Sequence, residues 1–232
     1  MVASVCIRLG FWQLDRLSQR RERNAALARA MEAPALSLTP DSLRAVAENP
    51  ERFLYRRVAV QGEYDFRGTA LLRGRARRGT PGVHLVTPLR IDGSEAALLI
   101  DRGWVPSPDA TTVDPRRFRQ PGEVALVGYL QLLPSASAGE ALPLRIELDG
   151  YSVPTFQRLD RIAYRETYPD SLLPFYLERV DEGDAAPTPP VGASPPVLDE
   201  GPHLGYAIQW FSFAAIGVIG FLIMVRRSRT TS

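Results

Sequence analysis

An uncharged apolar segment near the carboxyl end constrains this chain more than any other feature. Residues 204–225 carry no formal charge, and three arginines follow within the next four positions. At about 1.5 Å of rise per residue, a helix of this length crosses the roughly 30 Å hydrocarbon layer of a bilayer. The alternative is a buried helix of a soluble core, but such helices seldom stay uncharged for so long. We therefore predict a transmembrane helix at residues 203–225, with residues 226–232 as a cytoplasmic tail.

The expected helix has two different faces. One face carries His203, Tyr206 and Trp210 near its amino end, where Tyr and Trp commonly anchor a helix at the membrane surface. A neighbouring face is small and polar. Because small residues let backbones approach and a glutamine in lipid seeks a hydrogen-bond partner, we expect this second face to pack against another helix. Its members are Gly205, Gln209, Ser212 and Gly220.

The amino end predicts a first membrane helix that is truncated. Residues 1–7 are apolar, but this run is too short to cross a bilayer before Arg8 interrupts it. A helix-prone, arginine-rich segment follows, with Trp12 and Arg16 one turn apart, as at the end of a membrane helix that emerges among headgroups. An amphipathic surface helix is the alternative. We interpret residues 1–33 as the remnant of a membrane helix and the helix after it, and expect about ten further apolar residues upstream of Met1.

The middle of the chain, residues 34–181, predicts a β-rich domain. A short helix at residues 41–48 comes first, capped by Thr39 or Asp41. The pair Asp92-Gly93, between two apolar runs, is the clearest hairpin signal. Short strands with few long helical patterns favour an antiparallel sheet closed into a small barrel. The expected strands lie at residues 55–65, 70–75, 83–91, 96–105, 124–132, 144–148 and 172–180.

These segments together predict a membrane-anchored α+β fold in which two transmembrane helices flank the β-rich domain. Residues 182–202 are rich in Pro, Ala and Asp, which is typical of an extended linker. The arginines after residue 225 are expected to stay in the cytoplasm under the positive-inside rule, so the domain lies outside. The arginine-rich segment at residues 16–29 then also lies outside, against the same rule.

The composition excludes several classes of function. A single cysteine, Cys6, excludes an internal disulfide, a CxxC redox pair and a cysteine-rich metal site. His84 and His203 are the only histidines, so a histidine-rich metal site is equally unsupported. The formal charge of +2, with both signs interspersed, gives no nucleic-acid groove. Nucleophile elbow, phosphate loop, HExxH and dinucleotide fingerprint are all missing. We predict no enzymatic turnover and no catalytic residues.

Four motifs spread from residue 9 to residue 211 resemble those of the Surfeit locus protein one family. They are LGFWQLDR at 9–16, GVHLVTPL at 82–89, RGWVP at 102–106 and HLGYAIQWF at 203–211. The resemblance implies two transmembrane helices in the bacterial inner membrane, an intervening periplasmic domain, and a role in assembling cytochrome c oxidase by assisting haem a insertion into subunit I. The family has a full apolar helix before the first motif, whereas only a short apolar run precedes it here.

The resemblance also implies the cofactor and the partners. Haem a is the expected cofactor, bound transiently, and the expected partners are cytochrome c oxidase subunit I, the haem a synthase and the lipid bilayer. Two alternatives stay open. The first is a scaffold for oxidase subunits that carries no cofactor. The second, less favoured, is a two-helix membrane sensor, which normally needs a signalling module after its second helix.

His203 is the leading candidate for a haem ligand. A haem iron needs a neutral imidazole with its lone pair directed at the metal, and an apolar wall against the macrocycle. A histidine at the head of a membrane helix, with Tyr206 and Trp210 one and two turns below, offers both. The resemblance adds that this histidine is the one proposed to contact haem a. The alternative is that His203 merely caps a helix that begins after Pro202.

Two residues of the third motif are further candidates for haem contact. The planar guanidinium of Arg102 matches a haem propionate, and Trp104 suits a haem-binding or membrane-facing groove. For both residues, packing within the domain is the preferred interpretation. His84 is a weaker candidate ligand, because a histidine on a strand is more often satisfied by neighbouring side chains.

Overall fold

The computed structural model describes residues 2–135, 143–181, 188–196 and 198–230. The chain divides into two compact units. The first, which we call the helical unit, comprises Met1–Arg29 and Pro196–Ser232; the second, the barrel unit, comprises Ala30–Pro195. A helical anchor and a β-rich domain are what the sequence predicts, so the α+β fold class is confirmed.

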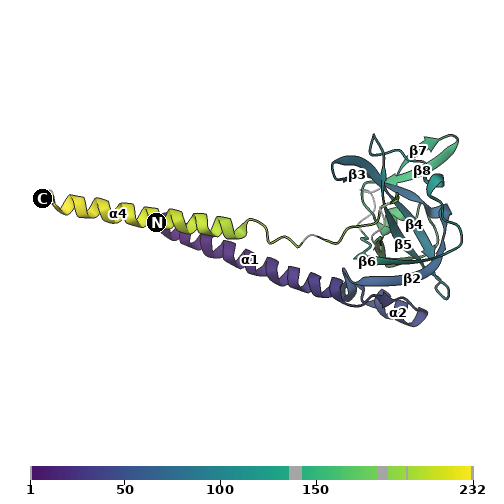
Figure 1. The fold of residues 1–232 in the computed structure, drawn as a ribbon, viewed down its shortest axis with the longest axis horizontal. Coiled ribbons are helices and arrows are strands. Elements are labelled where there is room, and N and C mark those ends of the chain that lie inside the picture. Colours follow the sequence, from purple (N-terminus) through teal and green to yellow (C-terminus); the bar gives the residue numbers. More distant parts are fainter. Residues whose placement is uncertain (1, 136–142, 182–187, 197, 231–232) are drawn as a thin grey trace. The chain divides into compact units, whose positions relative to one another are not determined.

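In the part of the chain that the structure describes, a nine-stranded sheet forms the barrel unit (Figure 1). The strand pairings close five of these strands into a ring. The closed order is β2–β6–β9–β5–β4, and the ring is completed where the end of β2 pairs with the end of β4 through Glu63–Arg90 and Tyr64–Leu89. Closure leaves no free edge in the ring. β3, β8 and β7 continue the sheet outward from β4. The strands are β1 (Leu36–Ser37), β2 (Arg57–Tyr64), β3 (Ala70–Arg77), β4 (Thr80–Arg90), β5 (Ala97–Pro106), β6 (Glu123–Leu132), β7 (Leu144–Leu148), β8 (Tyr151–Phe156) and β9 (Leu172–Arg179).

The pairing within this sheet is mixed. Consecutive strands such as β3–β4 and β4–β5 are antiparallel, as predicted, and so are β7–β8, β2–β6 and β6–β9. Three further pairs, β1–β2, β3–β8 and β5–β9, are parallel. Parallel neighbours need a long crossover connection, and β6, β7 and β8 all lie between β5 and β9 in the chain.

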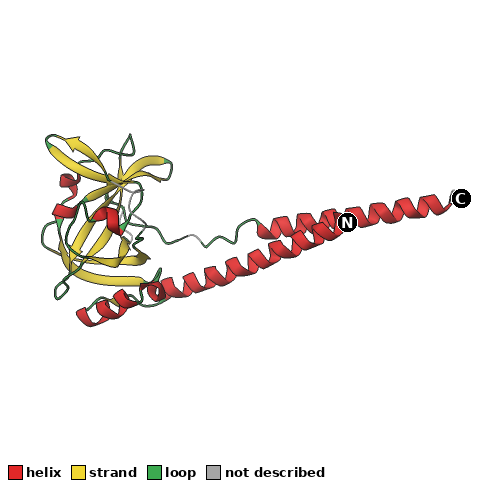
Figure 2. Ribbon diagram, turned by 180° about the vertical axis from the view of Figure 1, so that it is seen from behind, coloured by secondary structure: helices red, strands yellow, loops and turns green. Residues whose placement is uncertain are grey.

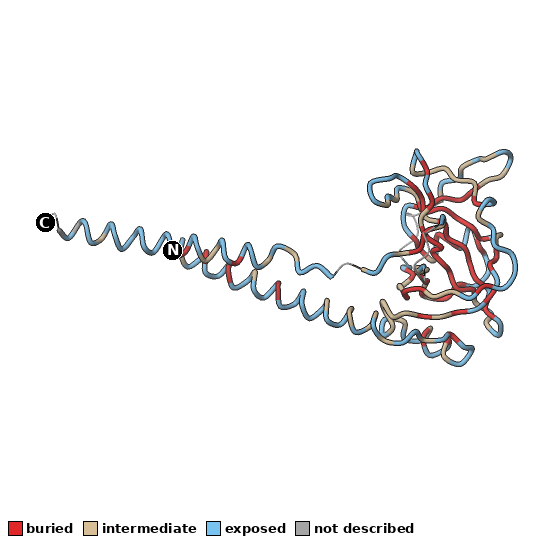
Figure 3. Tube along the Cα trace, viewed as in Figure 1, coloured by how far each residue is buried: buried red, intermediate tan, exposed pale blue. Residues whose placement is uncertain are grey.

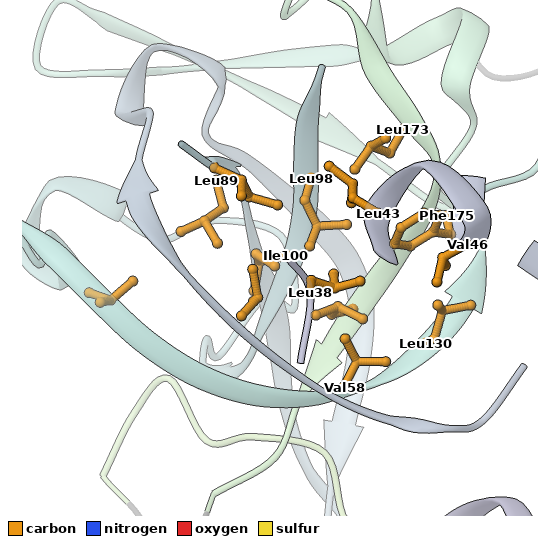
Figure 4. Close-up of a cluster of buried hydrophobic side chains, with 14 of the residues drawn as sticks. Leu38, Leu43, Val46, Val58, Leu89, Leu98, Ile100, Leu130, Leu173 and Phe175 are labelled. Atoms are coloured by element: carbon orange, nitrogen blue, oxygen red, sulfur yellow. The ribbon is translucent and has the colours of Figure 1, made fainter. Parts of the chain in front are cut away.

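Two hydrophobic clusters lie on opposite faces of β5. Leu98 and Ile100 belong to a cluster inside the barrel (Figure 4), whereas Ala97 and Leu99 belong to a second cluster with β8 and α3 (Arg161–Tyr164). Successive side chains of a strand point to opposite faces, so β5 is buried on both. Figure 3 shows the result as long buried runs in the strands.

A short helix, α2 (Pro40–Glu48), contributes to the core inside the barrel. Its Leu43 and Val46 are buried in that cluster, as Figure 4 shows. Thr39 caps the helix by accepting a hydrogen bond from the Ser42 amide at 3.3 Å, which confirms one of the two predicted caps. Three short 3₁₀ helices lie in the connections of the described chain. They are η1 (Pro50–Phe53) between α2 and β2, η2 (Phe66–Gly68) between β2 and β3, and η3 (Pro115–Phe118) between β5 and β6.

The helical unit contains most of α1 (Val2–Glu32) and all of α4 (His203–Thr230), which pack side by side (Figure 2). A Cβ added at Gly10 would lie 2.6 Å from the ring of Phe211. Phe11 also meets the Phe211 ring edge-on at 5.4 Å between centroids. The missing side chain of Gly10 therefore makes room for a large ring, and the predicted packing of the apolar helix against another helix is confirmed.

The predicted packing face of α4 is wrong. Ala207 and Ala214 are buried and share with Phe211 the side that meets α1, whereas Gln209 and Ser212 are exposed. A Cβ at Gly205 or Gly220 would meet nothing within 4 Å among the described residues. The small residue that permits close approach is on α1, so α4 does not need its own glycines for this contact.

One helix within the described ranges is long and apolar enough to cross a membrane. It covers His203–Arg227, with a mean hydropathy of 2.1, and only 6% of its most apolar window is buried. Large apolar side chains such as Ile216, Phe221 and Met224 are more than half exposed. Such a surface is costly in water and favourable in lipid.

Candidate functional site

His203 begins α4, and its imidazole contacts α1. The Pro202 carbonyl accepts the Tyr206 amide at 3.1 Å, which starts the helix where the sequence predicts. The Nδ1 atom of His203 lies 2.9 Å from Oε1 of Gln13. Because a carbonyl oxygen can only accept, this contact matches the tautomer with the proton on Nδ1. In that tautomer Nε2 holds the lone pair and can act as an electron-pair donor.

Two aromatic residues continue the His203 flank of α4. Tyr206 is 48% exposed, and Trp210 is half-buried with Phe213 edge-on at 6.0 Å. The structure therefore places His203, Tyr206 and Trp210, three of the five predicted haem-contacting residues, on one flank of α4. A haem would need an imidazole that donates a lone pair and an apolar surface, and this flank carries both residue types.

Polar contacts fix the chain just before His203 against α1. Arg21 forms a two-bonded ion pair with Glu200, with distances of 2.9 and 2.8 Å. Arg20 and Asn24 both donate to the Asp199 carbonyl at 3.0 Å. The hydrogen bond from Arg21 lowers the pKa of Glu200, so the carboxylate stays charged. These contacts hold residues 199–200 on the helix that carries Gln13.

Arg102 belongs to the barrel unit and is used there. The residue is 4% exposed, its Nη2 donates to the Phe118 carbonyl at 2.5 Å, and its guanidinium lies 4.6 Å from the centre of the Tyr64 ring. Burial lowers the pKa of Arg102. These contacts match the preferred interpretation, in which Arg102 packs within the domain; a contact with a haem propionate stays a prediction.

Trp104 also belongs to the barrel unit. Its backbone forms two hydrogen bonds of 2.7 Å with Val191. Its indole covers Gly82, where a Cβ would collide with Nε1. Nearby, Ala193 donates to the Arg179 carbonyl at 2.7 Å. Part of the segment predicted as a linker therefore lies on the barrel, and we call residues 190–194 the strap. The contacts of Trp104 with Gly82 and Val191 match the preferred interpretation, in which Trp104 packs within the domain. A contact of Trp104 with haem stays a prediction.

His84 has a carboxylate partner. Its Nδ1 lies 2.8 Å from Oδ2 of the buried Asp101. Both line a cavity of about 250 Å³ between the sheet and the strap, together with Glu178. Burial and the nearby charge of Asp101 raise the pKa of Glu178. The sequence did not indicate this cluster, because the parallel pairing of Asp101 with Glu178 joins strands far apart in the chain.

These acidic and histidine side chains do not make a metal centre. In the part of the chain that the structure describes, no group of three or more His, Cys, Asp or Glu side chains is placed to hold a metal ion. The two histidines instead have different partners at Nδ1. The partner of His84 is the carboxylate of Asp101, and the partner of His203 is the side-chain amide of Gln13.

Comparison with known proteins decides the family. A family model described as the SURF1 family matches residues 1–215. The chain belongs to the SURF1 family. A SURF1-like protein of Rickettsia bellii is 26% identical over 96% of this chain and 87% of its own length. A SURF1-like protein of Monosiga brevicollis is 26% identical over 100% and 87%. Surfeit locus protein 1 of Rattus norvegicus is 26% identical over 95% and 72%.

SURF1-family membership confirms the resemblance that the four motifs indicate. The family is known for cytochrome oxidase assembly factors, not for enzymes. The match includes both α1 and the head of α4, so Gln13 and His203 both lie within it. Gln13 is the residue of this site that the sequence did not single out.

Proposed function

We propose that this SURF1-family chain is a membrane-anchored assembly factor for cytochrome c oxidase that holds haem a for insertion into subunit I. The observation that carries the proposal is the hydrogen bond between His203 and Gln13. With the proton on Nδ1, Nε2 of His203 is a lone-pair donor at the head of the helix flank that also carries Tyr206 and Trp210. Subunit I, the haem a synthase and the lipid bilayer are the partners of this role.

Each residue of the site has one task in this proposal. Haem a, when bound, supplies an iron that accepts a nitrogen ligand. His203 offers Nε2 as that ligand, and Tyr206 and Trp210 give the macrocycle an apolar wall. A carrier must release its cargo, and a single imidazole suits transfer better than a closed site with two ligands. Arg102 and Trp104 are secondary candidates for haem contact.

The membrane placement is part of the same proposal. α4 spans the inner membrane, with its arginine-rich end in the cytoplasm and the barrel unit in the periplasm. Support comes from the apolar length of α4 and from the positive-inside rule, which retains Arg226, Arg227 and Arg229 in the cytoplasm. His203, at the opposite end of α4, then lies at the periplasmic boundary of the bilayer.

The test compares the two histidines in membranes that make haem a. His203→Ala is expected to remove the haem absorption that co-purifies with the wild-type chain, whereas His84→Ala keeps it. His84 is a suitable control because its Nδ1 also has a hydrogen-bond partner, whereas it lies in the barrel unit and not at the head of α4. A loss of haem in both variants would therefore not be specific to His203. Unchanged haem content in the His203 variant, at equal protein level, rejects ligation by this residue. A wild-type chain without haem absorption favours a scaffold that carries no cofactor.

A further inference from the structure

Gln13 occupies an unusual position on α1. The residues of α1 that meet α4 follow a spacing of alternately four and three, which is the seam of two packed helices. Cys6, Gly10 and Leu17 at this spacing are buried, and Gln13 falls between them. An apolar side chain at a seam position contributes more to packing than a polar one does. The polar group of Gln13 therefore needs an explanation other than the stability of the helix pair.

The explanation lies in the atom that Gln13 contacts. Its side-chain carbonyl accepts from Nδ1 of His203 over 190 positions of sequence. Which imidazole nitrogen carries the proton is set by the hydrogen bond that the other ring atom makes. We propose that Gln13 is a positioning residue, which fixes His203 as the Nδ1-protonated tautomer and directs Nε2 away from α1 as the donor atom. The role of Nε2 as a haem ligand rests on the proposed function, whereas the contact between Gln13 and His203 does not depend on it.

The surroundings of the two residues support this role. Phe211 fills the space at Gly10, one turn from Gln13, and Arg21 holds Glu200, three residues before His203. The pair is thus held from both sides. Gly201 lies beside the opposite edge of the ring, where a Cβ would be 3.6 Å from Nε2, so no side chain at that position covers the donor atom.

The neutral amide also sets how strongly His203 binds. A carboxylate on Nδ1 raises the basicity of an imidazole ligand, and Asp101 provides one for His84. Gln13 orients His203 without adding a negative charge. The result is an oriented ligand without a carboxylate partner on Nδ1, which suits a group that must accept a cargo and then release it.

The first experiment needs no haem. The full chain, labelled with ¹⁵N-histidine and purified haem-free in lipid nanodiscs, is examined by NMR for the tautomer of His203, with His84→Asn to leave one signal. We expect the Nδ1-protonated form in the parent chain and a shift towards the Nε2-protonated form in Gln13→Leu. Gln209→Leu, which changes an exposed glutamine of α4, is the matched control and leaves the tautomer unchanged. An unchanged tautomer in Gln13→Leu overturns the inference.

The second experiment measures haem retention by absorption spectroscopy in the same variants. Loss of a partner that orients a metal-binding histidine typically lowers affinity by about 10- to 100-fold. We expect a loss of that size in Gln13→Leu, none in Gln209→Leu, and retention with slower release in Gln13→Glu, whose carboxylate keeps an acceptor. Equal affinity in Gln13→Leu and wild type overturns the positioning role. A wild-type chain that binds no haem overturns the proposed function alone, because the tautomer measurement still decides what Gln13 does.

Discussion

Gly103 shows how a single residue holds the strap on the barrel. Its φ of +112° lies in a region that side chains disfavour, and a Cβ there would collide with the Val191 carbonyl. The lack of a side chain lets Val191 approach closely enough to pair with Trp104. The glycine of the RGWVP motif is thus explained by a close approach of two backbone segments rather than by contact with a ligand.

We expect Gly103→Ala to destabilise the protein by about 3 kcal/mol or more. Backbone strain contributes roughly 1–2 kcal/mol, and displacement of the strap adds the loss of its hydrogen bonds to β5. Gly122→Ala is the control, because Gly122 has a φ of +87° but nothing within 4 Å of the added Cβ. Thermal unfolding of the purified chain should show a much smaller loss for Gly122→Ala. Equal losses would mean that the collision with the strap costs nothing.

The residues of the proposed haem site differ in how far the sequence predicts them. His203, Tyr206 and Trp210 are close in the chain, and helical periodicity is sufficient to place them on one flank. Gln13 is 190 positions from His203, and no local pattern indicates a hydrogen bond between them. Arg102 and Trp104 carry the residue types that suit a haem, but the sequence cannot show that Phe118 and Val191 are their partners.

At the scale of elements, local patterns predict strands better than they predict pairing. Seven of the strands were expected within a few residues of their observed ends. β1 and β8 were not expected. β8 contains Pro154, which cannot donate to a ladder, and β8 pairs with β3 only from Thr155 onward, so Pro154 falls where one neighbour is present. Apolar and polar residues alternate in the same way in parallel and antiparallel strands. The sequence pattern therefore could not predict that β5 and β9 pair in parallel.

The contact between α1 and α4 gives a prediction that uses the single cysteine. Cys6 is 6% exposed, and Gly10, one turn along α1, admits the Phe211 ring. Gly10→Val should force the helices apart, since overpacking costs about 1–3 kcal/mol. We expect N-ethylmaleimide to modify Cys6 about tenfold faster in this variant, in detergent. Gly220→Val is the control, because its added Cβ meets nothing within 4 Å. An unchanged rate in Gly10→Val would show that this contact does not protect Cys6.

At the scale of the whole molecule, the arginines at the two ends of the chain favour opposite orientations in the membrane under the positive-inside rule. The segment at residues 16–29 is arginine-rich and is expected outside, against the positive-inside rule, whereas the arginines at the carboxyl end of α4 are expected inside and follow the rule. Part of the outer charge is used locally, because Arg21 pairs with Glu200 and Arg20 donates to the Asp199 carbonyl. Residues 226–232, most of which belong to the end of α4, include three arginines and no acidic residue.

We expect the three arginines at the carboxyl end of α4 to decide the orientation of the chain in the membrane. Green fluorescent protein fused after Ser232 should fluoresce, and alkaline phosphatase fused there should be inactive. Fluorescence of the first and inactivity of the second both indicate that the carboxyl end is in the cytoplasm. Replacing Arg226, Arg227 and Arg229 by Asn should produce a fraction of inverted chains with active phosphatase. The matched variant replaces Arg16, Arg23 and Arg29 by Asn, and should leave the phosphatase inactive. Active phosphatase in the parent fusion would place the carboxyl end outside, and would move His203 to the cytoplasmic boundary, away from a periplasmic transfer of haem.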